Sequence, residues 1–441
     1  MLKKMFLLLI FAAVSIFIIT ADDGFGDIFE ADESADLIDS SPGGVSFSGN
    51  TGFILKSYMD DGWGSELTSV PYLNLEIAPS SGDFEAMIRI NLDEEIISTE
   101  ILDELYLRYF FNYGYLEAGL MKAEWGKGDG YHVLDPLNPL NQSDGVVPDL
   151  NEMKDAVAML KLNLYAGTNG LLEFVYVPIF SGHSIAETGR WAVIDPSSIP
   201  NLITDLPGGL SGSSAALRYT TSLGPLDLGF QYYYGYKPEP GYRFESEFIG
   251  TNPAQMADPA FWETNTTMLY TRAHLAGIEA GWAAGPFTFR TEIGSWLTED
   301  IEGDLPEYWN SSLVALAGID LLLPGTNLFF SLQATESWVL DYEDRGLTDV
   351  NTAAAYDNNA TTTTIIPALE MPFGRDKFNL RMAGLYLVEA AGWMAYPSLS
   401  WYPVDGYEIG LSGQFFGGEK DSYYKSWEGN GTVSLEFKYI F

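Results

Sequence analysis

Residues 432–441 read TVSLEFKYIF, and this stretch decides the class of fold. Side chains along a β-strand point alternately to its two faces. One face of a strand over these residues would carry Val433, Leu435, Phe437, Tyr439 and Phe441. The opposite face would carry Ser434, Glu436 and Lys438. The stretch therefore predicts a strand with one apolar and one polar face at the C-terminus.

An alternating strand that ends in Phe resembles the signal that the barrel-insertion machinery reads in outer-membrane proteins. On this resemblance we predict that Tyr439 and Phe441 form an insertion signal. The resemblance also implies the insertion machinery as a partner and the outer-membrane lipid as the surroundings of the apolar face.

The same alternation recurs along the chain, in segments 84–91, 104–112, 226–236 and 407–416. A soluble β-sandwich would also alternate, but three further features favour a membrane barrel. The segments approach the ~9–11 residues that cross a bilayer at a tilt. Tyr, Phe and Trp gather at segment ends, as aromatic girdles do. Short turns alternate with long connections.

The turns give the predicted topology. Short turns include Gly285-Pro286 and the stretch Gly167 to Gly170. The long connections lie at about 124–153, 179–211, 237–265, 341–360 and 417–429. We predict an all-β fold: a single transmembrane antiparallel barrel of about 18 strands (16–18) over residues 44–441, with short periplasmic turns and long outer loops.

The N-terminus has the features of a secretory signal peptide. Lys3 and Lys4 precede an apolar run over residues 5–20, and Ala21 offers a small residue for cleavage. We predict a signal peptide over 1–21; the alternative is an uncleaved membrane anchor. The acidic residues 22–43 lack an apolar period and predict a flexible periplasmic tail. Together with the barrel, these features predict location in the outer membrane of the cell.

Composition excludes several classes of function. The chain holds 22 Lys and Arg against 61 Asp and Glu, a net charge of −39, so nucleic-acid phosphates would be repelled. Hydrophobic residues make up 46%, which argues against a disordered chain. No cysteine is present, which rules out disulfides, thiolate catalysis and thiolate-bound zinc.

Charged residues in phase with the polar faces are the candidates for a pore lining. In a pore such groups set the local field and select solutes; in a plugged barrel they only satisfy one another. Lys161, Asp320 and Arg381 fall on predicted inward faces. The candidate lumen and selectivity residues are Glu85, Arg89, Glu104, Arg108, Arg218, Arg290 and Glu292.

The connection EWGKGDGYHVLDPLNPLNQSDGVVPDLNEMKD, residues 124–155, is the most distinctive in the chain. It is too rich in proline and apolar residues to float in water, so we predict that it folds into the barrel as a constriction. A phosphate cradle lacks the required spacing, and a calcium site lacks regular ligand spacing. We therefore predict no metal and no cofactor. The candidate constriction residues are Trp125, Asp129, Asp135, Asn138 and Asp144.

This region is similar to a family of Gram-negative outer-membrane proteins catalogued as domain of unknown function 1302. Its signature "WG…DG…LD.LNP" stands here as Trp125-Gly126, Asp129-Gly130, Leu134-Asp135 and Asn138-Pro139. The family usually has an acidic residue soon after its NP, whereas here Asp144 follows only later. The resemblance implies a barrel and brings no settled substrate.

Enzymatic chemistry finds little support in the sequence. Of the three histidines, only His183 lies in a predicted outer loop beside a serine, and no catalytic partner is identifiable. His132 and His274 are predicted to be ordinary loop and lumen residues. We therefore predict a non-enzymatic protein.

Two functions remain. The first is a channel for passive passage of an unknown small solute. The solute would be polar, neutral or cationic, or it would be a hydrophobic molecule that follows an aromatic path. The second is a surface-exposed structural or adhesive barrel with a plugged lumen. The acidic balance of the chain favours cations or neutral solutes over anions.

Overall fold

A computed structural model describes the part of the chain that forms the barrel. The described residues are 44–59, 67–92, 101–143, 145–147, 149–186, 189–192, 203–204, 207–244, 265–346, 348–419 and 422–441. The predicted signal peptide and tail, residues 1–43, lie outside the described residues. Asp144, one of the predicted constriction residues, lies outside them as well.

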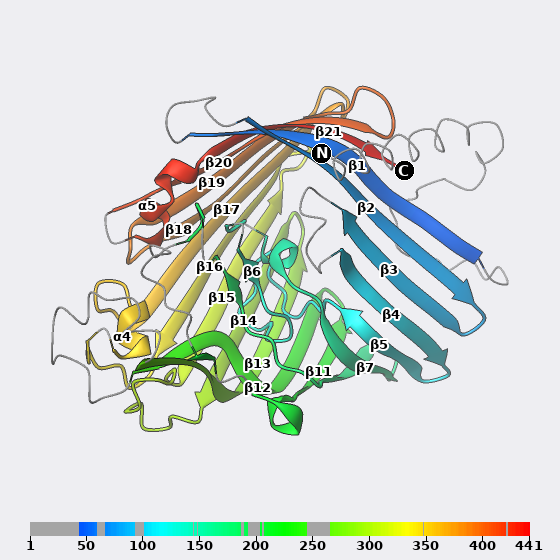
Figure 1. The fold of residues 1–441 in the computed structure, drawn as a ribbon. Coiled ribbons are helices and arrows are strands. Elements are labelled where there is room, and N and C mark those ends of the chain that lie inside the picture. The colour runs from blue at the N-terminus through cyan, green and yellow to red at the C-terminus, as the bar shows by residue number, and fades with distance from the viewer. Residues whose placement is uncertain are drawn as a thin grey trace, which may run out of the picture.

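Eighteen strands of the described chain form one closed antiparallel barrel (Figure 1). Each strand pairs with the next barrel strand along the chain, and β21 returns to pair with β1. The closure places Thr51 opposite Tyr439, and Gly49 and Phe441 exchange two backbone hydrogen bonds of 2.9 and 3.0 Å. Closing the ring leaves no unpaired edge, as a membrane requires. The predicted fold class and strand number are confirmed.

The barrel strands follow one another as in a large up-and-down barrel. They are β1 (Gly44–Tyr58), β2 (Leu67–Ser81), β3 (Phe84–Leu92), β4 (Leu102–Phe111), β5 (Gly114–Met121), β7 (Val157–Ala166), β8 (Gly170–Val177), β11 (Ser214–Leu223), β12 (Leu226–Phe244), β13 (Thr266–Ala284), β14 (Phe287–Thr298), β15 (Ser312–Leu322), β16 (Phe329–Val339), β17 (Thr361–Phe373), β18 (Phe378–Leu387), β19 (Gly392–Trp401), β20 (Tyr407–Gly417) and β21 (Thr432–Ile440).

The remaining elements are short and lie in the connections. They are β6 (Asn141–Gln142), β9 (Ser184–Ile185), β10 (Ile203–Thr204), the 3-10 helices η1 (Leu150–Met153), η3 (Gly209–Gly212) and η4 (Glu428–Asn430), and the helices α4 (Val350–Ala354) and α5 (Tyr423–Ser426). The strands β6 and β9 pair in parallel and tie two long connections together. Over the described ranges, no helix has the length and apolar character to span a membrane.

The two faces of the strands differ as the alternation predicts. On β12, Phe230, Tyr232 and Tyr234 are exposed on the outside of the barrel, whereas Gln231 and Tyr233 are buried inside. Exposed apolar side chains cover the outer surface, which is the arrangement that lipid solvates and water does not. The inner face carries the charged and amide side chains.

Aromatic pairs gather near the short turns. Phe84 and Tyr109 lie 4.8 Å apart between ring centroids, and Trp282 and Phe289 lie 5.5 Å apart. Outward-facing aromatic rings at the ends of strands form the girdle that marks a membrane interface.

Two sequence-based expectations need correction. The connection predicted at 237–265 starts later, because β12 continues to Phe244 through a register shift between Tyr236 and Pro240. Proline lacks an N–H, so it is tolerated at such an irregularity, where the ladder is already interrupted. His274, predicted to face the lumen, lies on the exposed outer face with its Nδ1 2.6 Å from the Tyr232 hydroxyl.

Candidate functional site: a loop packed inside the barrel

The connection between β5 and β7, residues 122–156, is called the inner loop below. It contacts inward-facing residues on strands far away in the sequence, including β12, β14 and β16. In Figure 1 its trace, with β6, runs inside the ring of strands. The inner loop therefore fills part of the lumen, as the sequence predicts.

A single carboxylate on β14 holds the first half of the inner loop. The Glu292 side chain is fully buried. Its Oε1 accepts the backbone N–H groups of Lys127 (2.7 Å) and Gly128 (2.8 Å). Its Oε2 accepts those of Val133 (2.8 Å) and Leu134 (3.1 Å). Four charge-assisted hydrogen bonds offset the cost of burying this charge.

His132 adds a cation to the same anchor. Its Nδ1 lies 3.3 Å from Glu292 Oε1, and its Nε2 lies 3.5 Å from Glu124 Oε1. Burial lowers the pKa of His132, but the contacts with Glu124 and Glu292 outweigh burial and raise this pKa to about 9. His132 is therefore protonated at neutral pH, and its charge stabilises the buried carboxylate.

Leu134 fixes the depth to which the inner loop sits. Its side chain is fully buried and lies over Gly277 on β13 and Gly294 on β14. A Cβ at either glycine would come within 2.6 Å of a Leu134 methyl carbon. The Leu134 carbonyl also accepts a hydrogen bond from the Gln231 side chain on β12. The two glycines thus form a socket for one apolar side chain.

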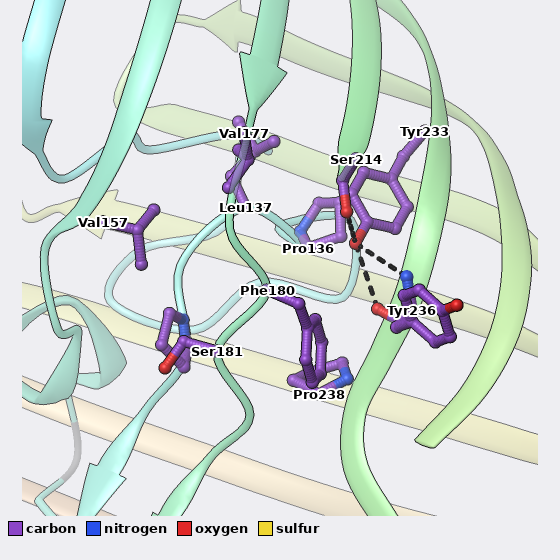
Figure 2. Close-up of a pocket in the computed structure, with 11 residues that line it drawn as sticks. Pro136, Leu137, Val157, Val177, Phe180, Ser181, Ser214, Tyr233, Tyr236 and Pro238 are labelled. Atoms are coloured by element: carbon purple, nitrogen blue, oxygen red, sulfur yellow. Dashed lines mark hydrogen bonds between the residues drawn. The ribbon is translucent and has the colours of Figure 1, made fainter. Parts of the chain in front are cut away.

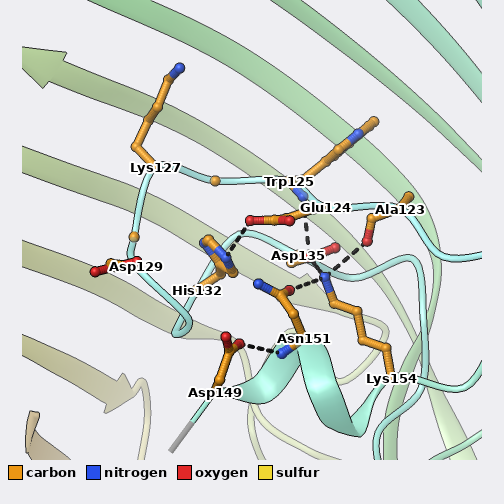
Figure 3. A network of polar contacts seen from close by, with 12 residues as sticks. Ala123, Glu124, Trp125, Lys127, Asp129, His132, Asp135, Asp149, Asn151 and Lys154 are labelled. Carbon is orange, nitrogen blue, oxygen red and sulfur yellow. Dashed lines mark hydrogen bonds and ion pairs between the residues drawn. The ribbon is translucent and has the colours of Figure 1, made fainter. Parts of the chain in front are cut away.

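A polar network closes the base of the inner loop (Figure 3). Lys154 Nζ binds Asp135 Oδ2 at 2.5 Å and donates to the Ala123 carbonyl at 2.9 Å. Asn138 accepts the Ala123 N–H at 2.8 Å and donates to the Met121 and Asp155 carbonyls at 3.1 and 2.8 Å. These bonds join the two ends of the inner loop, so it leaves and rejoins the wall as a rigid unit.

The second half of the inner loop packs on another part of the wall, formed by β18, β19 and β20. Val146 and Met153 are buried against Leu385, Met394 and Phe416, which project inward from β18, β19 and β20. The Gln414 side chain on β20 donates to the Val146 carbonyl at 2.6 Å. The inner loop therefore spans the lumen between β14 and β20.

Ion pairs line the inner wall from β2 to β5. Arg89 binds Glu76 (2.8 Å) and Glu104. Arg108 binds Glu117 (2.7 Å) and Glu85 (3.2 Å). These pairs join neighbouring strands from β2 to β5, and they leave the carboxylates of Glu104 and Glu117 compensated despite their burial.

Two further arginines, on β11 and β14, join the wall to the inner loop. Arg218 on β11 binds Glu279 at 2.5 Å, and its guanidinium lies 5.7 Å from the Trp125 ring. Arg290 on β14 binds Asp320 at 2.6 Å and donates to the Lys127 carbonyl at 3.1 Å.

All seven predicted lumen residues thus face the interior. Four of them contact the inner loop directly: Glu104, Arg218, Arg290 and Glu292. The other three, Glu85, Arg89 and Arg108, form ion pairs between neighbouring strands. Among the predicted constriction residues, Trp125, Asp135 and Asn138 hold the loop itself together. The backbone of Asp129 exchanges two hydrogen bonds with the Gln333 side chain on β16. Sequence reasoning missed Gln231, Gln333 and Lys154, because an inward amide or a loop lysine gives no signal without its partner.

A narrow pocket lies where the inner loop meets the wall (Figure 2). Pro136 and Leu137 of the loop face Val177, Phe180 and Tyr233 across it. The Tyr233 hydroxyl lies 3.2 Å from Ser214 Oγ and accepts the Tyr236 N–H at 3.2 Å. The pocket is therefore a narrow seam between the inner loop and the wall.

Comparison with known proteins gives a likeness of fold. No family model matches the sequence, so the resemblance to domain of unknown function 1302 stays a prediction. No curated protein matches it either.

Solved structures do match. OccK11 (OpdR) of Pseudomonas aeruginosa has 8% identity and a TM-score of 0.48, covering 90% of this chain and 96% of its own. OpdK of the same organism, solved with vanillate, has 9% identity and a TM-score of 0.49, covering 90% and 98%. A loop L8 deletion mutant of OmpT, an outer membrane protein of Vibrio cholerae, has 9% identity and a TM-score of 0.40, covering 91% and 100%.

Proposed function

We propose that the chain is an outer-membrane channel for the passive passage of small polar solutes, neutral or cationic, and that the inner loop is its constriction. One observation carries the proposal: the inner loop is anchored to two separate parts of the wall, while charged side chains on another part of the wall stay exposed to water. A barrel with an apolar outside and a partly hydrated, charged inside suits a polar solute crossing lipid.

The charge of the inner wall supports a preference for cations. Among the described residues, seven basic side chains form ion pairs in which both partners lie on barrel strands, and ten carboxylates are their partners. The bases are Arg89, Arg108, Lys161, Arg218, Arg290, Arg381 and Lys438. The carboxylates are Glu76, Glu85, Glu104, Glu117, Glu173, Glu279, Asp320, Glu370, Glu408 and Glu436. The excess of carboxylates attracts cations.

The test is reconstitution of the purified barrel in a planar bilayer under a salt gradient. We expect discrete current steps and a reversal potential that shows cation preference. A reversal potential of the opposite sign would contradict the acidic lumen.

A second variant tests the constriction. Deleting residues 128–148 removes most of the inner loop but leaves every barrel strand intact. We expect a larger single-channel conductance, with the heat-modifiable gel mobility of a folded barrel as the control. Unchanged conductance in a folded deletion variant would contradict the role of the loop while leaving the barrel intact.

A plugged structural barrel is the second candidate, and the tight packing of the inner loop is the observation that favours it. Folded protein that stays silent in the bilayer would support this alternative. Catalysis is not part of either proposal. His183 Nδ1 accepts the Leu140 N–H at 2.8 Å, and His132 is bound by two carboxylates, so both side chains have structural partners.

A further inference from the structure

Water reaches the charged side chains of the inner wall very unevenly. The side chains of Glu104, Glu117 and Glu279 are 3%, 3% and 0% exposed, although all three face the lumen. On the other side of the barrel, Arg381 on β18 is 69% exposed and Glu370 on β17 is 41% exposed. Both groups of residues point inward, so the difference follows from what covers them.

Glu117 is enclosed by Arg108, Lys161 and Asn163 of neighbouring strands. Glu104 binds the Lys122 N–H, and Arg218 joins Glu279 to the Gly126 carbonyl, so both carboxylates are covered with the help of the inner loop.

The inner loop lies against β11 to β16 through Arg218, Glu292 and Gln333. Beyond Gln414, where the loop touches β20, the inward positions nearer the short turns are small: Ser398, Ser400, Gly410 and Ser412. Small residues on the wall leave room for water beside the loop. The part of the wall formed by β17 to β21, with β1 to β3, is called the open wall below.

Charged groups on the inner loop face charged groups on the open wall. Glu152, in η1 of the inner loop, lies within range of charge interactions with Asp149 of the same loop and with Arg381 and Lys438 on the wall. Lys438 also binds Glu408 (3.1 Å) and Glu436 (3.7 Å) on the wall itself. An acidic group on the loop therefore lies opposite basic groups on the barrel.

We propose that solutes pass along the open wall, off the centre of the barrel, and that Glu152 and Arg381 set the charge preference of this path. The carboxylates there, which include Glu76, Glu370 and Glu436, outnumber the bases, so the path favours small organic cations over anions of equal size. The transport part of this inference rests on the proposed channel function. The presence of a water-filled path can be tested separately, without measuring current.

Thiol labelling tests the path directly, because the chain has no cysteine of its own. Ser398→Cys places a thiol on the open wall, beside Arg381 on the neighbouring strand. Ser331→Cys is the matched control: it also faces inward, but Ser331 is buried and bonded to Asp320. The probe is a cationic, membrane-impermeant methanethiosulfonate, and labelling is measured by mass on the folded protein.

We expect Ser398→Cys to be labelled at least about tenfold faster than Ser331→Cys, since a buried site reacts only after local opening. Both should label fully after unfolding. Equal rates, or no labelling of Ser398→Cys in the folded protein, would overturn the off-centre path. Labelling in the expected order by a barrel that carries no current would support the path and overturn the channel function.

The charge preference has its own test in the bilayer. Glu152→Gln should lower the ratio of cation to anion permeability, and Arg381→Gln should raise it. Glu428→Gln, which neutralises an exposed carboxylate in the connection before β21, should leave the ratio unchanged. An unaltered ratio in both test variants would overturn the assignment of Glu152 and Arg381.

Discussion

Replacing Glu292 by glutamine removes the charge that holds the inner loop while keeping the shape of the side chain. The carboxylate accepts four backbone N–H groups, two on each oxygen. Glutamine offers one oxygen and one NH₂ group. Two of the four backbone N–H groups would then face this NH₂ group, which is itself a donor and cannot accept them. A buried donor without an acceptor costs about 1–3 kcal/mol, and two such donors weaken loop docking by about 2–6 kcal/mol.

Limited proteolysis and single-channel recording measure this effect together. At about 1.4 kcal/mol per factor of ten, the population of undocked loop should rise at least about 25-fold. We expect faster cleavage within residues 122–156 and either a higher mean conductance or added current fluctuations. Glu85→Gln is the matched control, because Glu85 faces the lumen and binds Arg108 on the neighbouring strand rather than the inner loop.

The outcome that would refute this reasoning is a folded Glu292→Gln barrel with the cleavage rate and conductance of the unmodified protein. Such a result would mean that the apolar packing of Leu134, Val146 and Met153 holds the loop without the carboxylate.

Three further perturbations follow from the same structure. Raising the pH should loosen the inner loop, because the raised pKa of His132 contributes stability that is full below its ordinary value of 6.5 and is lost as pH rises through about 9. That contribution is at most about 3 kcal/mol, so loop cleavage should accelerate toward pH 10 in the unmodified protein and change little with pH in His132→Gln. Phe230→Arg, on the exposed outer face of β12, should lower the free energy of unfolding by about 2–4 kcal/mol if it lies near mid-bilayer, whereas Ser412→Arg on the inner face should fold normally. Denaturant titration in lipid measures both variants, and equal losses would mean that the faces are misassigned. Deleting Phe441 removes its two hydrogen bonds to Gly49 as well as the predicted insertion signal, and a truncated protein that still migrates as a folded, heat-modifiable barrel would contradict the importance of this residue.

The barrel could be predicted from the sequence because its signals are local. Side chains alternate with a period of two, so the sequence alone assigns Phe230 and Gln231 to opposite faces of the strand, without knowledge of any partner. Turn lengths then set the order of strands. The strand end at Phe244 was missed, because proline normally argues against a strand and only the pairing with β13 shows that β12 continues.

The packing of the inner loop inside the barrel could be predicted only in outline. Proline and apolar residues indicate that the inner loop needs burial. Several wall groups that bind it lie far away in the chain, 97 positions for Gln231 and 268 positions for Gln414. In the sequence, Glu292 is one candidate lumen residue among seven, and nothing distinguishes it from Glu85. Exposure separates the two residues, and exposure depends on where the loop lies, which no local pattern contains.

The glycines of the signature show what the motif encodes. Gly126 has a φ of +106°, and a Cβ there would lie 2.4 Å from Glu292 Oε1. At Gly128 a Cβ would lie 1.9 Å from the Tyr131 carbonyl oxygen. Both positions need glycine so that the backbone can approach and wrap a carboxylate. The stretch from Trp125 to Leu134 is therefore a carboxylate-binding turn, and its ligand is the barrel wall itself. The motif therefore fixes the loop in place. Under the proposed channel function, the choice of solute would depend on residues outside the motif, on the wall that the loop leaves uncovered.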